Sequence, residues 1–74
     1  MNKNLIKYVK ENLNASDAEI EYTIEEMVYC RIPCSVANED LYDRICGLID
    51  EYAEENGIKV DYEWSDIDEI IWEL

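Results

Sequence analysis

Hydrophobic residues recur three or four positions apart in three stretches of the chain, residues 4–13, 16–32 and 38–55. That spacing places them along one side of an α-helix, with polar residues on the opposite side. Each stretch therefore predicts an amphipathic helix that buries one face and leaves the other in water.

The residues at the ends of these stretches indicate where each helix begins and ends. Ser16 and Glu19 are typical of a capping box, in which two side chains accept hydrogen bonds from free backbone N–H groups. Pro33 ends the second stretch because its ring removes a donor. Asn38 is a favourable N-cap, and Gly57 suits the left-handed position that follows a helix. Short connections between the three helices favour antiparallel neighbours.

Residues 58–64 change the pattern from helical spacing to strict alternation. Ile58, Val60, Tyr62 and Trp64 are separated by Lys59, Asp61 and Glu63. A period of two predicts a β-strand, with the apolar side chains on one side. No second alternating stretch exists to pair with it, so an extended connector packed on the core is an equally good interpretation. Ser65, with Asp68 three positions later, then predicts a short last helix.

The predicted fold class is mainly α. We expect one domain over residues 1–74, built as a small helical bundle of three to four helices with one short extended segment near residues 58–64. The residues expected to be largely buried are Ile24, Val28, Ile45, Leu48, Ile49, Ile70 and Ile71.

Charge narrows the kinds of partner that the protein can bind. The chain has 19 acidic residues, six basic ones and no histidine, for a formal net charge of −13. Ten of the acids fall in residues 50–74, where Lys59 is the only base. Such a surface repels nucleic acid and anionic membrane and attracts basic proteins. We therefore expect no direct nucleic-acid partner and no membrane partner.

The candidate chemistry for catalysis or metal binding is weak. Cys30, Cys34 and Cys46 lack the fourth Cys or His of a structural zinc site, and no His is present to activate a thiolate. An acidic stretch starting at Asp61 has Asp66 where a calcium loop needs Gly. We expect no metal, no cofactor and no enzyme activity. Free thiols and the lack of an apolar signal segment favour the cytoplasm.

The spacing of the acids is the most informative feature. Glu21 and Glu25, Asp50 and Glu54, Glu51 and Glu55, and Glu69 and Glu73 are each four residues apart. Each such pair costs a helix roughly 0.2–0.5 kcal/mol. Rows of carboxylates on helices favour an acidic protein-binding module. One form of such a module is a nucleic-acid mimic that inhibits a DNA- or RNA-binding protein. Proteins that antagonise restriction and CRISPR systems are similar in size and charge alone.

We expect the binding surface to lie in the C-terminal half, with Tyr62 and Trp64 as apolar anchors. The alternative is a small adaptor or oligomerisation module that pairs through residues 58–64. In that case the acidity serves only solubility, and the partner can be a second copy of the chain, which gives a homodimer. The predicted partner-binding residues are Asp50, Glu51, Glu54, Glu55, Asp61, Tyr62, Glu63, Trp64, Asp66, Asp68 and Glu69.

Overall fold

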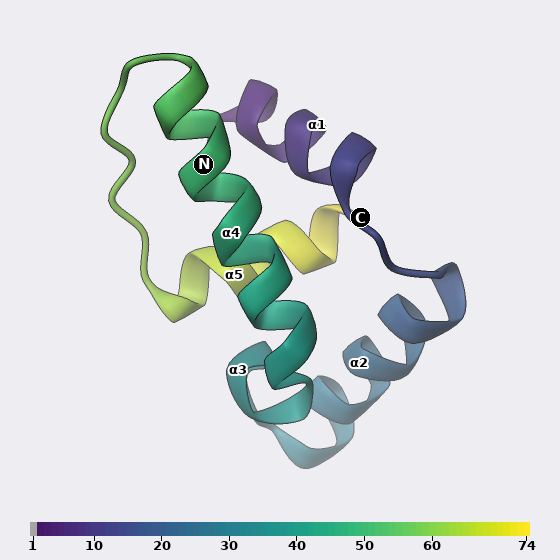
Figure 1. Cartoon of the computed structure of the whole chain (residues 1–74). Helices are drawn as coiled ribbons and strands as arrows, with labels where there is room; N and C mark the ends of the chain where they lie inside the picture. Colours follow the sequence, from purple (N-terminus) through teal and green to yellow (C-terminus); the bar gives the residue numbers. More distant parts are fainter. Residues whose placement is uncertain (1) are drawn as a thin grey trace.

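The computed structural model describes residues 2–74, and it confirms a small, mainly α-helical domain (Figure 1). Within these residues the backbone forms no β-strand. The molecule measures 38 × 22 × 19 Å along its principal axes. Its helices are α1 (Lys3–Asn12), α2 (Asp17–Cys30), α3 (Cys34–Ala37), α4 (Glu39–Glu55) and α5 (Trp64–Glu73).

Side-chain caps begin the helices largely where the sequence predicts. The Ser16 hydroxyl accepts from the backbone N–H of Glu19 at 3.1 Å, and Asn38 Oδ1 accepts from that of Leu41 at 3.1 Å. Only half of the predicted capping box forms, because the Glu19 carboxylate turns away to Arg44 and Asn38. Each cap satisfies a donor that the helix itself cannot pair.

Two helices end with a residue in the left-handed region. Gly57, with φ 62°, follows α4, and hydrogen bonds from Gly57 N–H to Glu54 C=O and from Ile58 N–H to Ala53 C=O complete the termination. This pattern satisfies the last carbonyls of the helix. Arg31, with φ 54°, ends α2 in a similar way, and the Ile32 N–H donates to Met27 C=O. Arg31 adopts this backbone without the freedom of a glycine.

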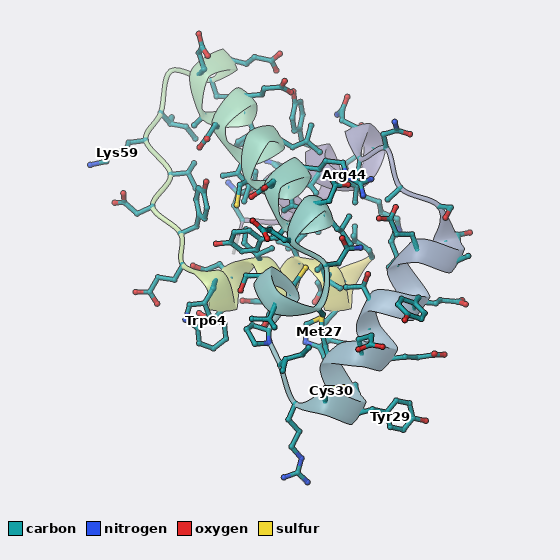
Figure 2. All side chains as sticks on the ribbon, turned by 60° about the horizontal axis from the view of Figure 1, so that its bottom comes forward. Met27, Tyr29, Cys30, Arg44, Lys59 and Trp64 are labelled. Carbon is teal, nitrogen blue, oxygen red and sulfur yellow. The ribbon has the colours of Figure 1, made fainter. Side chains whose placement is uncertain are left out.

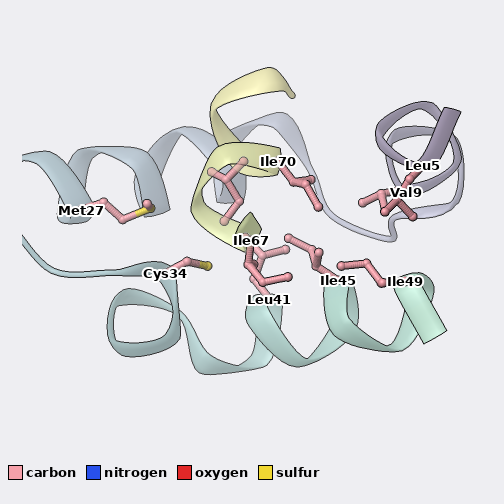
Figure 3. Close-up of a cluster of buried hydrophobic side chains, with 10 residues drawn as sticks. Leu5, Val9, Met27, Cys34, Leu41, Ile45, Ile49, Ile67 and Ile70 are labelled. Atoms are coloured by element: carbon pink, nitrogen blue, oxygen red, sulfur yellow. The ribbon is translucent and has the colours of Figure 1, made fainter. Parts of the chain in front are cut away.

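The core forms where α5 crosses behind α4, and α1, α2 and α3 complete it (Figure 1). Figure 3 shows Ile67 and Ile70 of α5 directed toward α4, while the α1 side chains approach the far end of the cluster. Burying one such side chain stabilises the fold by about 1.5–3 kcal/mol. The buried hydrophobic residues are Leu5, Val9, Met27, Cys34, Leu41, Ile45, Ile49, Ile67, Ile70 and Ile71.

The prediction of the α2 core face is partly wrong. Val28 is 54% exposed, whereas Thr23 and Met27 are buried. Ile24 is half-buried, as is Leu48 of α4. The reason is that α2 contacts α3 and α5 along only one edge, which turns Val28 out of the interior. Threonine is not hydrophobic, so the sequence pattern does not indicate that Thr23 is buried. The buried positions Thr23 and Met27 each lie one residue before the predicted positions Ile24 and Val28.

Residues 58–63 form an extended connector, not a strand, so the connector interpretation is the correct one. The alternation survives in part: Val60 and Tyr62 pack against the core, but Ile58 is 48% exposed and Trp64 is 56% exposed. The last helix starts at Trp64 instead of after Ser65. Its capping box pairs Glu63 with Asp66, whose carboxylate accepts from the Glu63 N–H at 2.9 Å.

The short helix α3 was not predicted. Pro33 precedes it, and its backbone closes through hydrogen bonds from Val36 and Ala37 N–H to Pro33 C=O. Four residues are too few to show a helical period in the sequence. None of the described helices is both long and apolar enough to cross a membrane.

Candidate partner-binding surface

The predicted binding residues fall on three consecutive parts of the structure. Asp50, Glu51, Glu54 and Glu55 are exposed on the second half of α4. The chain then turns back along α4 through the connector, which carries the next group, and enters α5 (Figure 1). Exposed on the connector and on α5 are Asp61, Glu63, Trp64 and Glu69, whereas Tyr62, Asp66 and Asp68 are half-buried.

Tyr62 fixes the connector to α4. Its hydroxyl donates to Asp50 Oδ1 at 3.4 Å, and its ring packs against the core. Burial, followed by the neighbouring Cys46 and Asp50, raises the pKa of Tyr62 above its ordinary value. The hydroxyl therefore stays protonated and remains a donor at neutral pH. Tyr62 acts here as an internal anchor, while Trp64 and Lys59 point into solvent (Figure 2).

Tyr8 contacts α4 in a similar way from the side of α1. Its ring lies 5.5 Å from that of Tyr52, and its hydroxyl donates to Glu51 Oε2 at 3.4 Å. Desolvation, with the charges of Glu55 and Glu51, raises the pKa of Tyr8. Two tyrosines thus brace α4 from either side, each donating to an acid on its surface.

Two of the predicted acids are engaged inside the fold. Asp66 completes the capping box of α5. Asp68 Oδ1 accepts from the backbone N–H of Cys34 at 2.9 Å and so holds the start of α3 against α5. Both of these half-buried carboxylates accept from backbone N–H groups, whereas the exposed Asp50 and Glu51 accept from tyrosine hydroxyls.

The structure also shows an acidic face on α4 that extends beyond the predicted residues. Its members share the side of the helix opposite to the buried positions, and all are exposed. In the sequence, the signal for this face is the spacing of three and four residues between its polar positions. We define the acidic face of α4 as Asp40, Asp43, Gly47, Asp50, Glu51 and Glu54.

Gly47 lies in the middle of this face. Nothing lies within 4 Å of the position that a Cβ atom would occupy there, so packing within the chain does not require a glycine. A glycine inside a helix costs roughly 0.8–1 kcal/mol relative to alanine. Gly47 therefore makes α4 less stable at the centre of an exposed, otherwise acidic surface.

Few bases neutralise the acidic face. Arg44 borders it, but its guanidinium is shared between Asp40, at 2.9 Å, and Glu19, at 2.5 Å. Across residues 2–74, the other ion pairs join Lys7 to Glu11 and Lys59 to Asp61, each at 3.9 Å. Among residues 2–74, these contacts give no basic partner to the acids of the face from Asp43 onward.

The cysteines and acids of the described chain form no group of three or more that could hold a metal ion. Cys30 is exposed, Cys46 is half-buried and Cys34 is buried, and all three thiols are free. Burial, with the nearby Asp68 and Cys46, raises the pKa of Cys34 to about 12. At neutral pH this thiol is protonated and lacks the nucleophilic form that covalent chemistry requires.

The candidate surface therefore consists of the exposed carboxylates on α4 and the connector. The chain matches no protein-family profile, no curated protein and no solved structure, so the surface is interpreted from its own residues.

Proposed function

We propose that the protein binds a basic surface of a partner protein through the acidic face of α4 and the adjoining connector. In this proposal the partner is a DNA- or RNA-binding protein of the cytoplasm, and the acidic chain inhibits it by occupying its nucleic-acid groove. The single observation that carries the proposal is the exposed acidic face of α4, with carboxylates on both sides of Gly47.

The spacing of charge on this face supports mimicry of a phosphate backbone. From Asp40 to Glu54, α4 rises about 21 Å at 1.5 Å per residue, and five carboxylates lie on the face within that length. The four intervals between these five charges average roughly 5 Å along the helix axis, wider than the ~3.4 Å between phosphates along one strand of duplex DNA but of the same order. A rigid helix holds these charges in a fixed row, which a solvated, flexible tail would not.

Gly47 adds a steric argument. A side chain at this position would separate the helix from any flat or convex surface laid on the acidic face. Its absence lets a partner backbone approach α4 closely, between the carboxylates on either side of it. A surface that served only solubility would gain nothing from the loss of helix stability at this position.

The test is a pull-down at low salt with two matched variants. The face variant carries Asp43→Asn, Asp50→Asn and Glu54→Gln. The control variant carries Glu11→Gln, Glu26→Gln and Glu73→Gln, which remove the same charge elsewhere. We expect the wild-type and control proteins to retain a nucleic-acid-binding partner that duplex DNA or RNA displaces. Equal retention by the face variant would refute the proposal.

A second candidate function rests on the connector. Ile58 and Trp64 are 48% and 56% exposed, and the connector backbone between them is extended. An adaptor could add a strand from its partner along this segment. Salt separates the two functions, because binding through carboxylates weakens steeply with ionic strength and binding through apolar side chains does not.

A further inference from the structure

A second surface, separate from the acidic face of α4, lies between α2 and the end of α5. It is an open groove of about 320 Å³, lined by Asp17, Ile20, Glu21, Ile24 and Leu74. Its volume is at the lower limit of small-molecule sites, which are about 300–1,000 Å³ and enclose most of their ligand. An open groove of this size suits side chains presented by a larger partner.

The groove belongs to two parallel rows of residues along α2. Residues four apart on a helix lie above one another on the same side. We call Ile20, Ile24 and Val28 the apolar row, and Asp17, Glu21 and Glu25 the acidic row. Val28, at 54% exposed, extends the apolar row beyond the groove itself. All three members of the acidic row are exposed, and α2 contains no base.

The outer side of α2 has no covering element within the described chain. Figure 2 shows α2 at the edge of the molecule, with Tyr29 directed into solvent. Tyr29 is 84% exposed and Tyr22 is 63% exposed. The core takes one side of this helix, through the buried Thr23 and Met27 and the half-buried Ile24. The remaining apolar surface is therefore available to another molecule.

We infer that this groove binds a basic amphipathic helix of a partner protein. The apolar side chains of that helix lie on the apolar row, and its Lys or Arg side chains meet the acidic row. The aliphatic stem of a Lys or Arg also packs on an apolar floor while its charged end stays at a polar rim. Helices that bind in grooves use anchors spaced in this way.

Charge complementarity selects this occupant over a second copy of the chain. Two copies would each bring a formal net charge of −13 to the contact, and the acidic rows would face another acidic surface. A basic helix neutralises three carboxylates that lie within two turns of one another. This inference is independent of the acidic face of α4, because the apolar row that binds the partner helix lies on α2.

The experiment uses the full chain and a synthetic peptide of about five helical turns, with leucine on one side and lysine on the other. A scrambled peptide of identical composition has the same charge and no apolar side. We expect the amphipathic peptide to bind at about 150 mM salt and the scrambled one to bind roughly tenfold more weakly by calorimetry. Amide NMR shifts should concentrate in residues 17–29 and at Leu74.

Matched charge reversals locate the site. Glu21→Lys should weaken peptide binding by roughly tenfold, whereas Glu54→Lys, the same change on exposed α4, should weaken it by about twofold or less. Val28→Asp, which alters the apolar row at an exposed position, should also weaken binding. Circular dichroism checks that each variant is folded.

Three results of the peptide experiments would overturn the inference. These are equal losses from Glu21→Lys and Glu54→Lys, amide shifts confined to α4, or failure of the amphipathic peptide to bind. A dimer seen by sedimentation, with α2 amides shifting on dilution, would assign the groove to a second copy and overturn it as well.

Discussion

Arg44 of α4 and Glu19 of α2 form the ion pair that joins these two helices, with 2.5 Å between Arg44 Nη2 and Glu19 Oε2. The same guanidinium donates to the backbone carbonyl of Asn14, in the connection between α1 and α2. The side-chain amide of Asn38 donates both to Glu19 Oε2, at 3.1 Å, and to Thr23 Oγ1, at 3.1 Å. One polar network thus fixes the start of α2 against the start of α4.

The first prediction concerns the pH dependence of this network. Hydrogen bonds from Arg44 and Asn38 lower the pKa of Glu19. A lowered folded pKa contributes stability above the unfolded value of about 4.3, and this stability is lost as pH falls through the folded value. Glu19→Gln should therefore lower the melting temperature at pH 7, with the difference from wild type shrinking below about pH 4.5. Glu25→Gln is the control, and an equal effect there would contradict the prediction.

The second prediction concerns the thiols at alkaline pH. The pKa of Cys34, about 12 in the folded protein, is well above the ~8.5 of an exposed thiol. Its folded form holds the proton more tightly, so stability present below pH ~8.5 should be lost as pH rises toward 12. Denaturant melts between pH 8 and 10 should show this decline, and Cys34→Ala should reduce its slope.

Alkylation of the native protein at pH 8 offers an independent check. Cys30 is exposed, so iodoacetamide should modify it first, while Cys34 should react only under denaturing conditions. Rapid modification of Cys34 in the folded protein would contradict its burial.

The third prediction concerns Gly47. Gly47→Ala should stabilise the protein by about 0.8–1 kcal/mol, because its new methyl group meets nothing and α4 gains helix propensity. Chemical denaturation measures this gain. If the acidic face binds a partner closely, the more stable Gly47→Ala protein should bind that partner more weakly, and Gly47→Leu more weakly still. Unchanged binding by both variants would remove the steric role proposed for this glycine.

The fourth prediction compares two hydrophobic residues. Ile45 is fully buried, so Ile45→Ala should cost about 2–5 kcal/mol. Val28 is more than half exposed, so Val28→Ala should change the stability by about 0.5 kcal/mol or less. Both variants shorten an apolar side chain on a helix. A similar loss from each would place Val28 in the core, as the sequence pattern predicted.

The fifth prediction concerns salt. The formal charge of −13 repels itself in the compact state, and added salt screens exposed charges beyond about 8 Å at physiological ionic strength. The melting temperature should rise with sodium chloride. It should rise less in a variant with Glu51→Gln, Glu54→Gln and Glu55→Gln. A melting temperature that falls with salt would show that ion pairs outweigh the repulsion.

The sequence was sufficient to predict the four longer helices, though not α3, because most of their boundaries depend on local chemistry. Ser16, Asn38 and Gly57 act at the positions predicted for them, through contacts with residues at most five positions away. The buried face of α4 was also predicted correctly at Ile45 and Ile49, because it follows the helical period without interruption.

The errors and omissions arise where distant contacts decide. Thr23 is buried because Asn38 supplies it with a hydrogen-bond partner from fifteen residues away, which no local pattern reveals. The ion pair of Arg44 with Asp40 is local, since the two residues lie four apart on α4, but the pairing of Arg44 with Glu19 depends on how α2 and α4 meet. Among the candidate site residues, Asp68 looks like one more surface acid in the sequence, and only the fold shows it holding α3.

The position of α5 has a consequence for synthesis of the protein. Ile67, Ile70 and Ile71 are fully buried, and α5 contacts α2, α3 and α4. A ribosome makes the chain from its N-terminus at about 5–20 residues per second, so α1 and α4 emerge with their apolar sides uncovered. The native core cannot close until α5 has been translated. Folding of this small domain is therefore delayed until its last helix leaves the ribosome, and during that interval the high charge of the nascent chain opposes its aggregation.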